Sequence, residues 1–208
     1  MKPVLIVFGT RHGTSRKIAG RLAARLVRRR VPVELVDAAH VPPGLDVDAH
    51  AAVFVVASVH AGKHLSEVIT FARTHRAALE RLPSVLVSVS LSAAIAADAL
   101  GLPERRAAAQ AELLHMFAAF VADTGWSPRQ LEPVAGALTY RAYPFFLRQL
   151  MRVVAWRAGA PTDTSRDHEL TDWKGVDRIA EAMVGRLVVP RPPVPKAPPR
   201  AEMSMSWN

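Results

Sequence analysis

The chain has 208 residues, of which half are hydrophobic and 22% are charged, so it can form a globular domain with a buried core. It contains no cysteine, which excludes a disulfide framework, a thiol nucleophile, a thiolate zinc site and a cysteine-ligated iron–sulfur cluster. Its 27 Lys and Arg residues against 18 Asp and Glu residues give a net charge of +9, which favours anionic partners.

The first part of the chain alternates between predicted strands and helices. Residues 4–8 are an unbroken run of β-branched and aromatic residues, which is typical of a strand buried on both faces. A small, hydroxyl-rich loop follows at 9–15, and the spacing of apolar residues predicts a helix over 16–27. Residues 33–37 and 51–57 predict the second and third strands.

The second part continues this alternation. Residues 65–82 fit a helix, 85–89 a fourth strand, 107–123 a long alanine-rich helix and 133–138 a fifth strand. A last helix is expected over 171–187, capped at its start by a threonine and an aspartate. Continuously apolar strands that alternate with helices predict an α/β fold with a doubly wound parallel sheet, in which ligands bind beyond the carboxyl ends of the strands.

The expected domain covers residues 1–189 and contains an excursion at 139–170. A tail at 190–208 holds six prolines and has no apolar periodicity, so it is interpreted as a disordered extension. No targeting or membrane-spanning segment is predicted, and the protein is expected in the cytoplasm.

The loop after the first strand has the features of an anion site. It reads Thr-Arg-His-Gly-Thr-Ser over residues 10–15, where backbone N–H groups and the dipole of the following helix converge. Gly13 permits a turn with positive φ. The loop lacks the spacing of a nucleotide P-loop and of the G-x-G-x-x-G fingerprint, which leaves a phosphate site for a mononucleotide. The alternative is a plain turn in which the hydroxyl of Thr14 or Ser15 caps the helix.

Two further loops are expected at the same edge of the sheet. Residues 57–62 follow the third strand and residues 88–92 follow the fourth, and both loops are small and carry hydroxyl groups. Together the three loops suit a flat, polar heterocycle. The predicted cofactor-binding residues are Thr10, Arg11, His12, Gly13, Thr14, Ser15, Ala57, Ser58, Val59, His60, Ala61, Gly62, Ser88, Val89, Ser90, Leu91 and Ser92.

Five segments, in the same order along the chain, resemble one known family. They are VLIVFGTRHGTSRKIA at 4–19, VASVHAGKHLSEV at 56–68, PSVLVSVSLSA at 83–93, VAGALTYRAYPFFLRQLMRVVAWRAGAPTDT at 134–164 and TDW at 171–173. With these segments the chain resembles the flavodoxin-like family and, within it, the menaquinone-dependent protoporphyrinogen IX dehydrogenases of bacterial haem biosynthesis. The most specific part is A-G-A-L-x-Y followed by a basic apolar helix and G-x-P-T-D-T.

This resemblance implies a fold, a cofactor and a reaction. The fold is a five-stranded parallel sheet in the order 2-1-3-4-5, with the phosphate of FMN on the first of the three loops and the isoalloxazine ring between the other two. The reaction is the oxidation of protoporphyrinogen IX to protoporphyrin IX, with electrons passed through FMN to a membrane quinone and no nucleophilic side chain. The chain differs from the family pattern at His12, His60 and Ala61, where a small or acidic residue, an arginine and a tyrosine are expected.

The excursion at 139–170 predicts a contact with substrate or membrane. No acidic residue occurs between residues 134 and 162, and both tyrosines of the chain lie there. A helix over 144–157 would combine arginines with apolar residues, which fits an interfacial helix on anionic lipid or a grip on the propionates of a porphyrinogen. The protein would then be peripherally associated with the inner face of the cell membrane. The alternative is a helix that covers the sheet edge with solvated arginines. The predicted contact residues are Tyr140, Arg141, Arg148 and Arg152.

Other classes of function fit less well. His60 and His64 are four residues apart but lack an obvious third ligand, so no metal site is predicted. No G-x-S-x-G motif indicates a hydrolase, and the arginines of the first helix have no interleaved aromatic residues, so they are interpreted as a solvated face and no nucleic acid is expected. Two alternatives stay open: a flavodoxin-type electron carrier or flavin module that serves a protein partner, and a relative that has lost its flavin.

Overall fold

The structure is a computed structural model that describes residues 1–158 and 160–188; the tail predicted at 190–208 lies outside the described residues. The strands are β1 (Val4–Gly9), β2 (Val33–Asp37), β3 (Ala52–His60), β4 (Lys63–His64), β5 (Ser84–Ser90), β6 (Leu131–Ala135), β7 (Ala137–Leu138) and β8 (His168–Glu169). The helices are α1 (Thr14–Arg28), α2 (Ser66–Thr74), α3 (Arg76–Arg81), α4 (Leu91–Ala97), α5 (Pro103–Thr124), α6 (Phe145–Ala158) and α7 (Trp173–Val188).

Five parallel strands form the central sheet in the order β2-β1-β3-β5-β6. This confirms the predicted α/β fold and its strand order 2-1-3-4-5, because β4 is a two-residue strand that pairs antiparallel with the end of β3, off the main path. Every residue of β1 and of β5 is buried, as the continuous apolar runs predicted. All five carboxyl ends therefore meet at one edge of the sheet.

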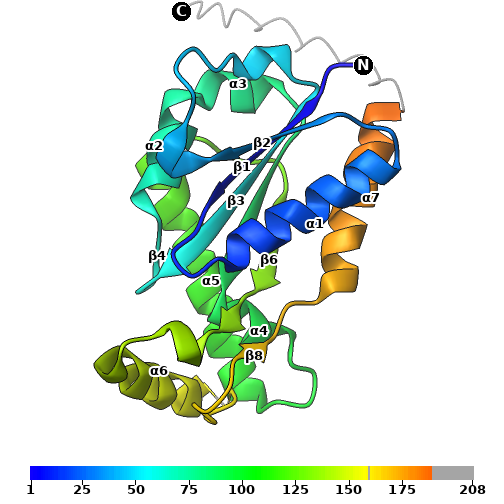
Figure 1. Cartoon of the computed structure of the whole chain (residues 1–208). Coiled ribbons are helices and arrows are strands. Elements are labelled where there is room, and N and C mark those ends of the chain that lie inside the picture. Colours follow the sequence, from blue (N-terminus) through cyan, green and yellow to red (C-terminus); the bar gives the residue numbers. More distant parts are fainter. Residues whose placement is uncertain (159, 189–208) are drawn as a thin grey trace, which may run out of the picture.

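Helices cover both faces of this sheet (Figure 1). On one face α1 and α7 pack side by side over alternate residues of the strands, such as Ile6 and Phe54. On the other face α2, α3 and α5 cover the intervening residues, such as Leu5 and Val55, together with the fully buried Trp126. None of the helices in the described part of the chain is both long and apolar enough to span a bilayer.

Ion pairs join three arginines of α1 to α7, which corrects, for these three, the interpretation of the α1 arginines as a solvated face. Arg21 donates two hydrogen bonds to Asp177, at 2.7 and 2.8 Å. Arg25 and Arg29 both donate to Glu181, at 2.7 and 3.0 Å. The hydrogen bond from Arg21 is the main cause that lowers the pKa of Asp177. These arginines therefore pair with the acidic residues that α7 presents toward α1, beside the apolar contact between the two helices.

Two predicted elements are divided in the structure. The helix expected over 65–82 is two helices, α2 and α3, because His75 leaves helical geometry at φ −103° and ψ 18° and its ring packs on Phe71. The fifth strand expected over 133–138 ends at Ala135, and β7 pairs antiparallel with β8 in a separate two-stranded sheet. Between them Gly136 lies close to Val89, where a Cβ would be 3.3 Å from a side-chain methyl.

The free edge of β6 is closed to further strand pairing. Pro133 has no N–H to donate, and the carbonyl of Ala135 accepts a hydrogen bond from the Thr171 hydroxyl at 2.9 Å. The long alanine-rich helix expected over 107–123 begins four residues earlier, at Pro103, which is favourable at the first position of a helix. Helix α4 precedes it and was not predicted.

Candidate functional site

A cavity of about 620 Å³ lies at the carboxyl ends of the strands. It is bounded by the three predicted loops, by residues 136–138, and by Tyr143 and α6 of the excursion. Twelve of the seventeen predicted cofactor-binding residues line it: Thr10, His12, Thr14, Ser58, Val59, His60, Ala61, Gly62, Val89, Ser90, Leu91 and Ser92. The topology therefore brings the three loops together as expected.

The loop before α1 presents an uncapped helix N-terminus to this cavity. The residue before the helix is Gly13, at φ +84°, and no side chain accepts a hydrogen bond from the first turn of α1. The Thr10 hydroxyl instead accepts from the N–H of Gly13 at 2.9 Å, and the space beside Gly13 is open. The alternative of a helix capped by Thr14 or Ser15 is therefore wrong. Free first-turn N–H groups and the helix dipole favour an anion here.

Three residues predicted to contact the cofactor have side chains buried behind the cavity, so this part of the prediction is corrected. The hydroxyls of Ser15 and Ser58 lie 2.6 Å apart, and Ser15 is fully buried. Ser88 is also fully buried, and its hydroxyl is 2.9 Å from Nε2 of His64. Ala57 is buried within β3. These hydrogen bonds connect the loops to one another, and Ser15, Ala57 and Ser88 do not line the cavity.

The loop after β5 begins α4 and faces a carboxylate that the sequence prediction missed. Ser90 caps α4 by accepting from the N–H of Ala93 at 3.2 Å. The Ser92 hydroxyl donates to Glu112 of α5 at 2.8 Å, and Glu112 lines the cavity. Because Glu112 lies on a helix far from the loops in sequence, no local motif could have identified it.

Two histidines and a tyrosine gather at the cavity from three separate segments. The ring of His12 lies 5.3 Å from that of His60 and 4.9 Å, edge-on, from that of Tyr143. Burial, and then the charge of Arg11, lowers the pKa of His12. Burial is also the main cause that lowers the pKa of His60, followed by His12 and Arg11, with Glu67 opposing. Neutral imidazoles are therefore favoured at neutral pH, and two of the positions that differ from the family pattern are in contact.

The third position that differs, Ala61, is in a strained turn. Residues Ala61 and Gly62 connect β3 to β4 with φ of +48° and +74°, so both central positions of this two-residue hairpin turn are left-handed. Such turns favour Asn-Gly, because an L-residue with a Cβ pays about 1–2 kcal/mol in the left-handed region and asparagine tolerates it best. Ala61 therefore adopts the left-handed conformation at a higher energy than asparagine would.

Replacing this residue should stabilise the fold. We expect Ala61→Asn to raise the free energy of unfolding by about 1 kcal/mol, or the melting temperature by about 2–4 °C, because it forms the favoured Asn-Gly turn. The matched control Gly62→Ala should lower stability by a similar amount. Thermal melts followed by circular dichroism, without added ligand, measure both changes. A melting temperature unchanged by Ala61→Asn would contradict the assignment of strain to this turn.

The excursion closes over the cavity, but Tyr140 does not have the surface role predicted for it. Its side chain is fully buried, and its hydroxyl donates to the carbonyl of Pro161 at 2.8 Å. Tyr143 lines the cavity in its place, and Arg148 of α6 donates to the Tyr143 carbonyl at 3.1 Å. The half-buried Arg148 has a buried Nε without a partner among the described residues. Both hydrogen bonds join residues within the excursion, so Tyr140 and Arg148 stabilise its internal structure.

The other predicted contact residues are exposed. Arg141 donates from its Nε to the carbonyl of Ser165 at 3.2 Å and is otherwise open to solvent, and Arg152 is exposed on α6. Around them α6 exposes large apolar side chains: 65% of Phe145, 86% of Phe146 and 69% of Trp156. The helix predicted over 144–157 thus forms, at Phe145–Ala158, with both basic and apolar groups on its surface.

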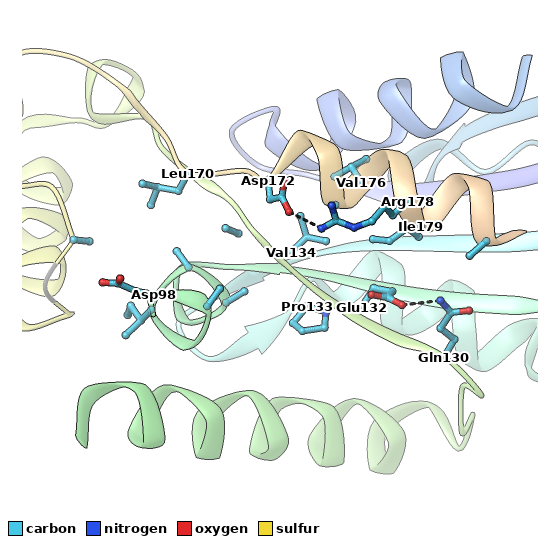
Figure 2. Close-up of a pocket in the computed structure, with 18 of the residues that line it drawn as sticks. Asp98, Gln130, Glu132, Pro133, Val134, Leu170, Asp172, Val176, Arg178 and Ile179 are labelled. Atoms are coloured by element: carbon cyan, nitrogen blue, oxygen red, sulfur yellow. Dashed lines mark hydrogen bonds and ion pairs between the residues drawn. The ribbon is translucent and has the colours of Figure 1, made fainter. Parts of the chain in front are cut away.

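A second cavity, of about 660 Å³, lies between α4, β6 and α7 (Figure 2). None of the predicted site residues lines it. Several of its polar side chains are paired with one another: Arg178 with Asp172 at 3.0 Å, and Gln130 with Glu132 at 2.6 Å. The start of α7 borders this cavity, but the carboxylate of Asp172 accepts hydrogen bonds from the backbone N–H groups of Gly175 and Lys174 there. The first cavity is therefore the better candidate for an anionic cofactor.

No group of three or more His, Asp or Glu side chains within residues 1–158 and 160–188 is arranged to hold a metal ion. His60 and His64 belong to the paired strands β3 and β4, and His64 is buried against Ser88 and Phe120. Burial lowers the pKa of His64 to about 4, so it is a neutral core residue above that pH.

Comparison with known proteins agrees with this geometry. The chain is 28% identical over 178 residues to "Protoporphyrinogen IX dehydrogenase [quinone]" of Escherichia coli K12, covering 85% of this chain and 91% of that protein. It is 27% identical over 195 residues to the protein of the same name from Leishmania major, covering 93% and 79%. Among solved structures, a short-chain flavodoxin associated with a PDU bacterial microcompartment aligns with a TM-score of 0.50 at 11% identity, covering 90% and 99%, which supports the fold alone.

The family comparison covers most of the domain. The family described as "Flavodoxin domain" matches residues 5–165, which include the sheet, the three loops and α6. The chain belongs to the flavodoxin domain family.

Proposed function

We propose that this protein is an FMN-dependent dehydrogenase that oxidises protoporphyrinogen IX to protoporphyrin IX and passes the electrons to a membrane quinone. The observation that carries the proposal is the uncapped start of α1 at Gly13, which faces a cavity of about 620 Å³ bounded by three loops of a flavodoxin domain. The substrate and the electron acceptor are proposed from the name of the similar proteins, protoporphyrinogen IX dehydrogenase [quinone].

The residues around the cavity fit a flavin mononucleotide. The free N–H groups at the start of α1, with the hydroxyls of Thr10 and Thr14, would hold the phosphate. The backbone of 58–62 and 89–92 would hold the flat ring, as small side chains there permit close approach. When bound, the flavin supplies the two-electron redox chemistry, and the protein binds and orients the reactants.

The excursion would hold the substrate and bring the site to the membrane. Arg141 and Arg152 offer exposed guanidinium groups for the propionates of a porphyrinogen or for anionic lipid. The exposed rings of Phe145, Phe146 and Trp156 lie on α6, as Arg152 does, and would enter the lipid interface, where the quinone is dissolved. In this proposal the enzyme is a peripheral protein at the inner face of the cell membrane.

The visible spectrum of the purified protein tests the cofactor first. We expect a yellow protein that releases FMN, identified by mass, and that turns over protoporphyrinogen IX with a quinone acceptor. A protein that stays colourless with excess FMN would contradict the whole proposal. Bound FMN without porphyrinogen turnover would overturn the dehydrogenase and favour an electron carrier that serves a protein partner.

The arginines of the excursion have a separate test. The double variant Arg141→Gln and Arg152→Gln should lower quinone-coupled turnover on anionic vesicles about tenfold, because each arginine contributes on the order of 1 kcal/mol near such a surface. FMN should stay bound, since neither side chain lines the cavity. Steady-state rates with vesicles of phosphatidylglycerol and phosphatidylcholine measure the effect, and an unchanged rate would remove the role of these arginines. Arg178→Gln, an exposed arginine on α7, is the control.

A further inference from the structure

The loop between α4 and α5 exposes two leucines that the proposed function does not use. Leu100 is 98% exposed and Leu102 is 57% exposed, although both are among the residues most often buried in proteins. Single exposed leucines are common, so exposure alone has no meaning. These two leucines differ from single exposed leucines in two respects: they lie in an ordered turn, and this turn is at the same end of the molecule as α6.

The loop holds Leu100 in an ordered turn. The N–H of Leu100 donates to a carboxylate oxygen of Asp98 at 3.0 Å, and the N–H of Gly101 donates to the Asp98 carbonyl at 3.3 Å. The next helix begins at once with Pro103, at the first helical position. The side chain of Leu100 is therefore projected outwards by a turn that is hydrogen-bonded on its inner side.

This turn lies at the same end of the molecule as α6. In Figure 1 the loop that joins α4 to α5 and the helix α6 both lie at the lower end, beyond the carboxyl ends of the strands. Ile95 of α4 and Met151 of α6 line the candidate cavity, so the cavity lies between these two helices. Apolar side chains thus project beyond the same edge of the sheet from two separate segments that flank the site.

Exposed cations also lie at this end of the molecule, in the loops after β1 and β3 and in the excursion. Arg11 in the first loop, Lys63 after the β3–β4 turn, Arg141 and Arg152 are all exposed at this end of the molecule. Next to the leucines the chain carries both signs: Asp98, which accepts from the N–H of Leu100, and Glu104 are exposed acids, and Arg105 is an exposed cation. The excess of basic groups at this end comes from the loops and the excursion, where Asp163 is paired with Arg166 at 3.1 Å. Basic residues at the same end as apolar projections complement an anionic lipid surface.

We propose that Leu100 and Leu102 form a second lipid-inserting point, so that the protein rests on an anionic membrane on both this turn and α6. This inference rests on the proposed function, because it assumes the membrane contact of α6. A helix and a separate turn together define a plane of docking, whereas the helix alone would leave the protein free to rotate about the helix axis. The carboxyl ends of the strands, and the cavity with them, then face the bilayer.

The absence of cysteine makes this proposal directly testable. Single variants Leu100→Cys, Phe146→Cys and Leu114→Cys each provide one site for an environment-sensitive fluorophore in the full chain. Leu114 is the matched control, because it is 71% exposed on α5 but lies about 16 Å further along the helix axis from Pro103. With vesicles of phosphatidylglycerol and phosphatidylcholine, we expect a blue shift of the label at 100 and 146 and none at 114.

Vesicle co-sedimentation gives the second measurement. The double variant Leu100→Ser and Leu102→Ser should bind at least fivefold more weakly, Leu114→Ser should bind as the parent does, and both should retain their circular dichroism spectra. If Phe146→Ser weakens binding while the double variant and the label at 100 show no change, the second contact is wrong and the proposed role of α6 stands. If the parent chain does not bind anionic vesicles, both membrane contacts are wrong, whereas the flavin and substrate assignments are tested separately.

Discussion

Lowering the pH from 7 to 4.5 should cost the protein about 2.5 kcal/mol of stability through His64 alone. Its side chain is 6% exposed, packs edge-on against Phe120 and lies 2.9 Å from the Ser88 hydroxyl. Burial lowers the pKa of His64 from 6.5 to about 4. Above pH 6.5 the imidazole is neutral in both the folded and the unfolded chain, so the free energy of unfolding does not depend on pH through this residue. Below pH 6.5 the imidazole becomes protonated in the unfolded chain but stays neutral in the folded chain. The free energy of unfolding therefore falls by about 1.4 kcal/mol for each pH unit.

The loss ends near pH 4, where the folded protein also takes up the proton. Urea unfolding at pH 7 and pH 4.5 measures the difference, and His64→Gln should reduce it by about 2–3 kcal/mol because glutamine keeps a polar group near Ser88 without titrating. The two proteins should show the same dependence on urea, which would indicate that both unfold by exposing the same surface. A variant that loses as much stability as its parent between the two pH values would contradict this role of His64.

The sequence pattern was sufficient to predict the sheet, because continuously apolar strands are compatible with few positions in a fold. A strand such as β5, with all seven residues buried, cannot lie at a surface, and short connections between parallel strands require helices on both faces. The position of the loop at 10–15 was predictable for the same reason, since Gly13 is followed at once by a helix of clear apolar periodicity. In these cases local composition and long-range packing agree.

What the sequence did not predict depends on contacts between distant residues. Ser15 and Ser88 are small hydroxyl residues of the kind that bind ligands, but their hydroxyls form hydrogen bonds with Ser58 and His64. These partners lie 43 and 24 positions away in the sequence. Glu112 enters the cavity because α5 crosses the loop after β5. Tyr140 and Tyr143 are three residues apart, yet one is bonded in the interior and the other lines the site. No local spacing distinguishes these outcomes.

The second large effect is expected at Gly13, where flavin affinity depends on backbone geometry. Gly13 has φ +84° and ψ −9°, and no atom lies within 4 Å of the position of an added Cβ. Gly13→Val therefore meets no steric clash with its surroundings, but it places a β-branched residue in the left-handed region, which costs about 1–2 kcal/mol or more. The loop can relieve this strain by rotating away, and the first-turn N–H groups of α1 then lose their alignment.

The affinity for FMN should fall by this strain energy, because the bound state is expected to need the aligned loop whereas the loop of the free protein can relax. We expect Gly13→Val to weaken FMN binding at least tenfold, measured by quenching of flavin fluorescence in a titration. Gly13→Asn is the matched control, since asparagine adopts left-handed geometry at low cost and should retain most of the affinity. Equal affinities for the valine variant and the parent would show that the loop does not hold the phosphate in the geometry described. Because the fold itself is expected to tolerate both substitutions, circular dichroism separates a lost site from a lost structure.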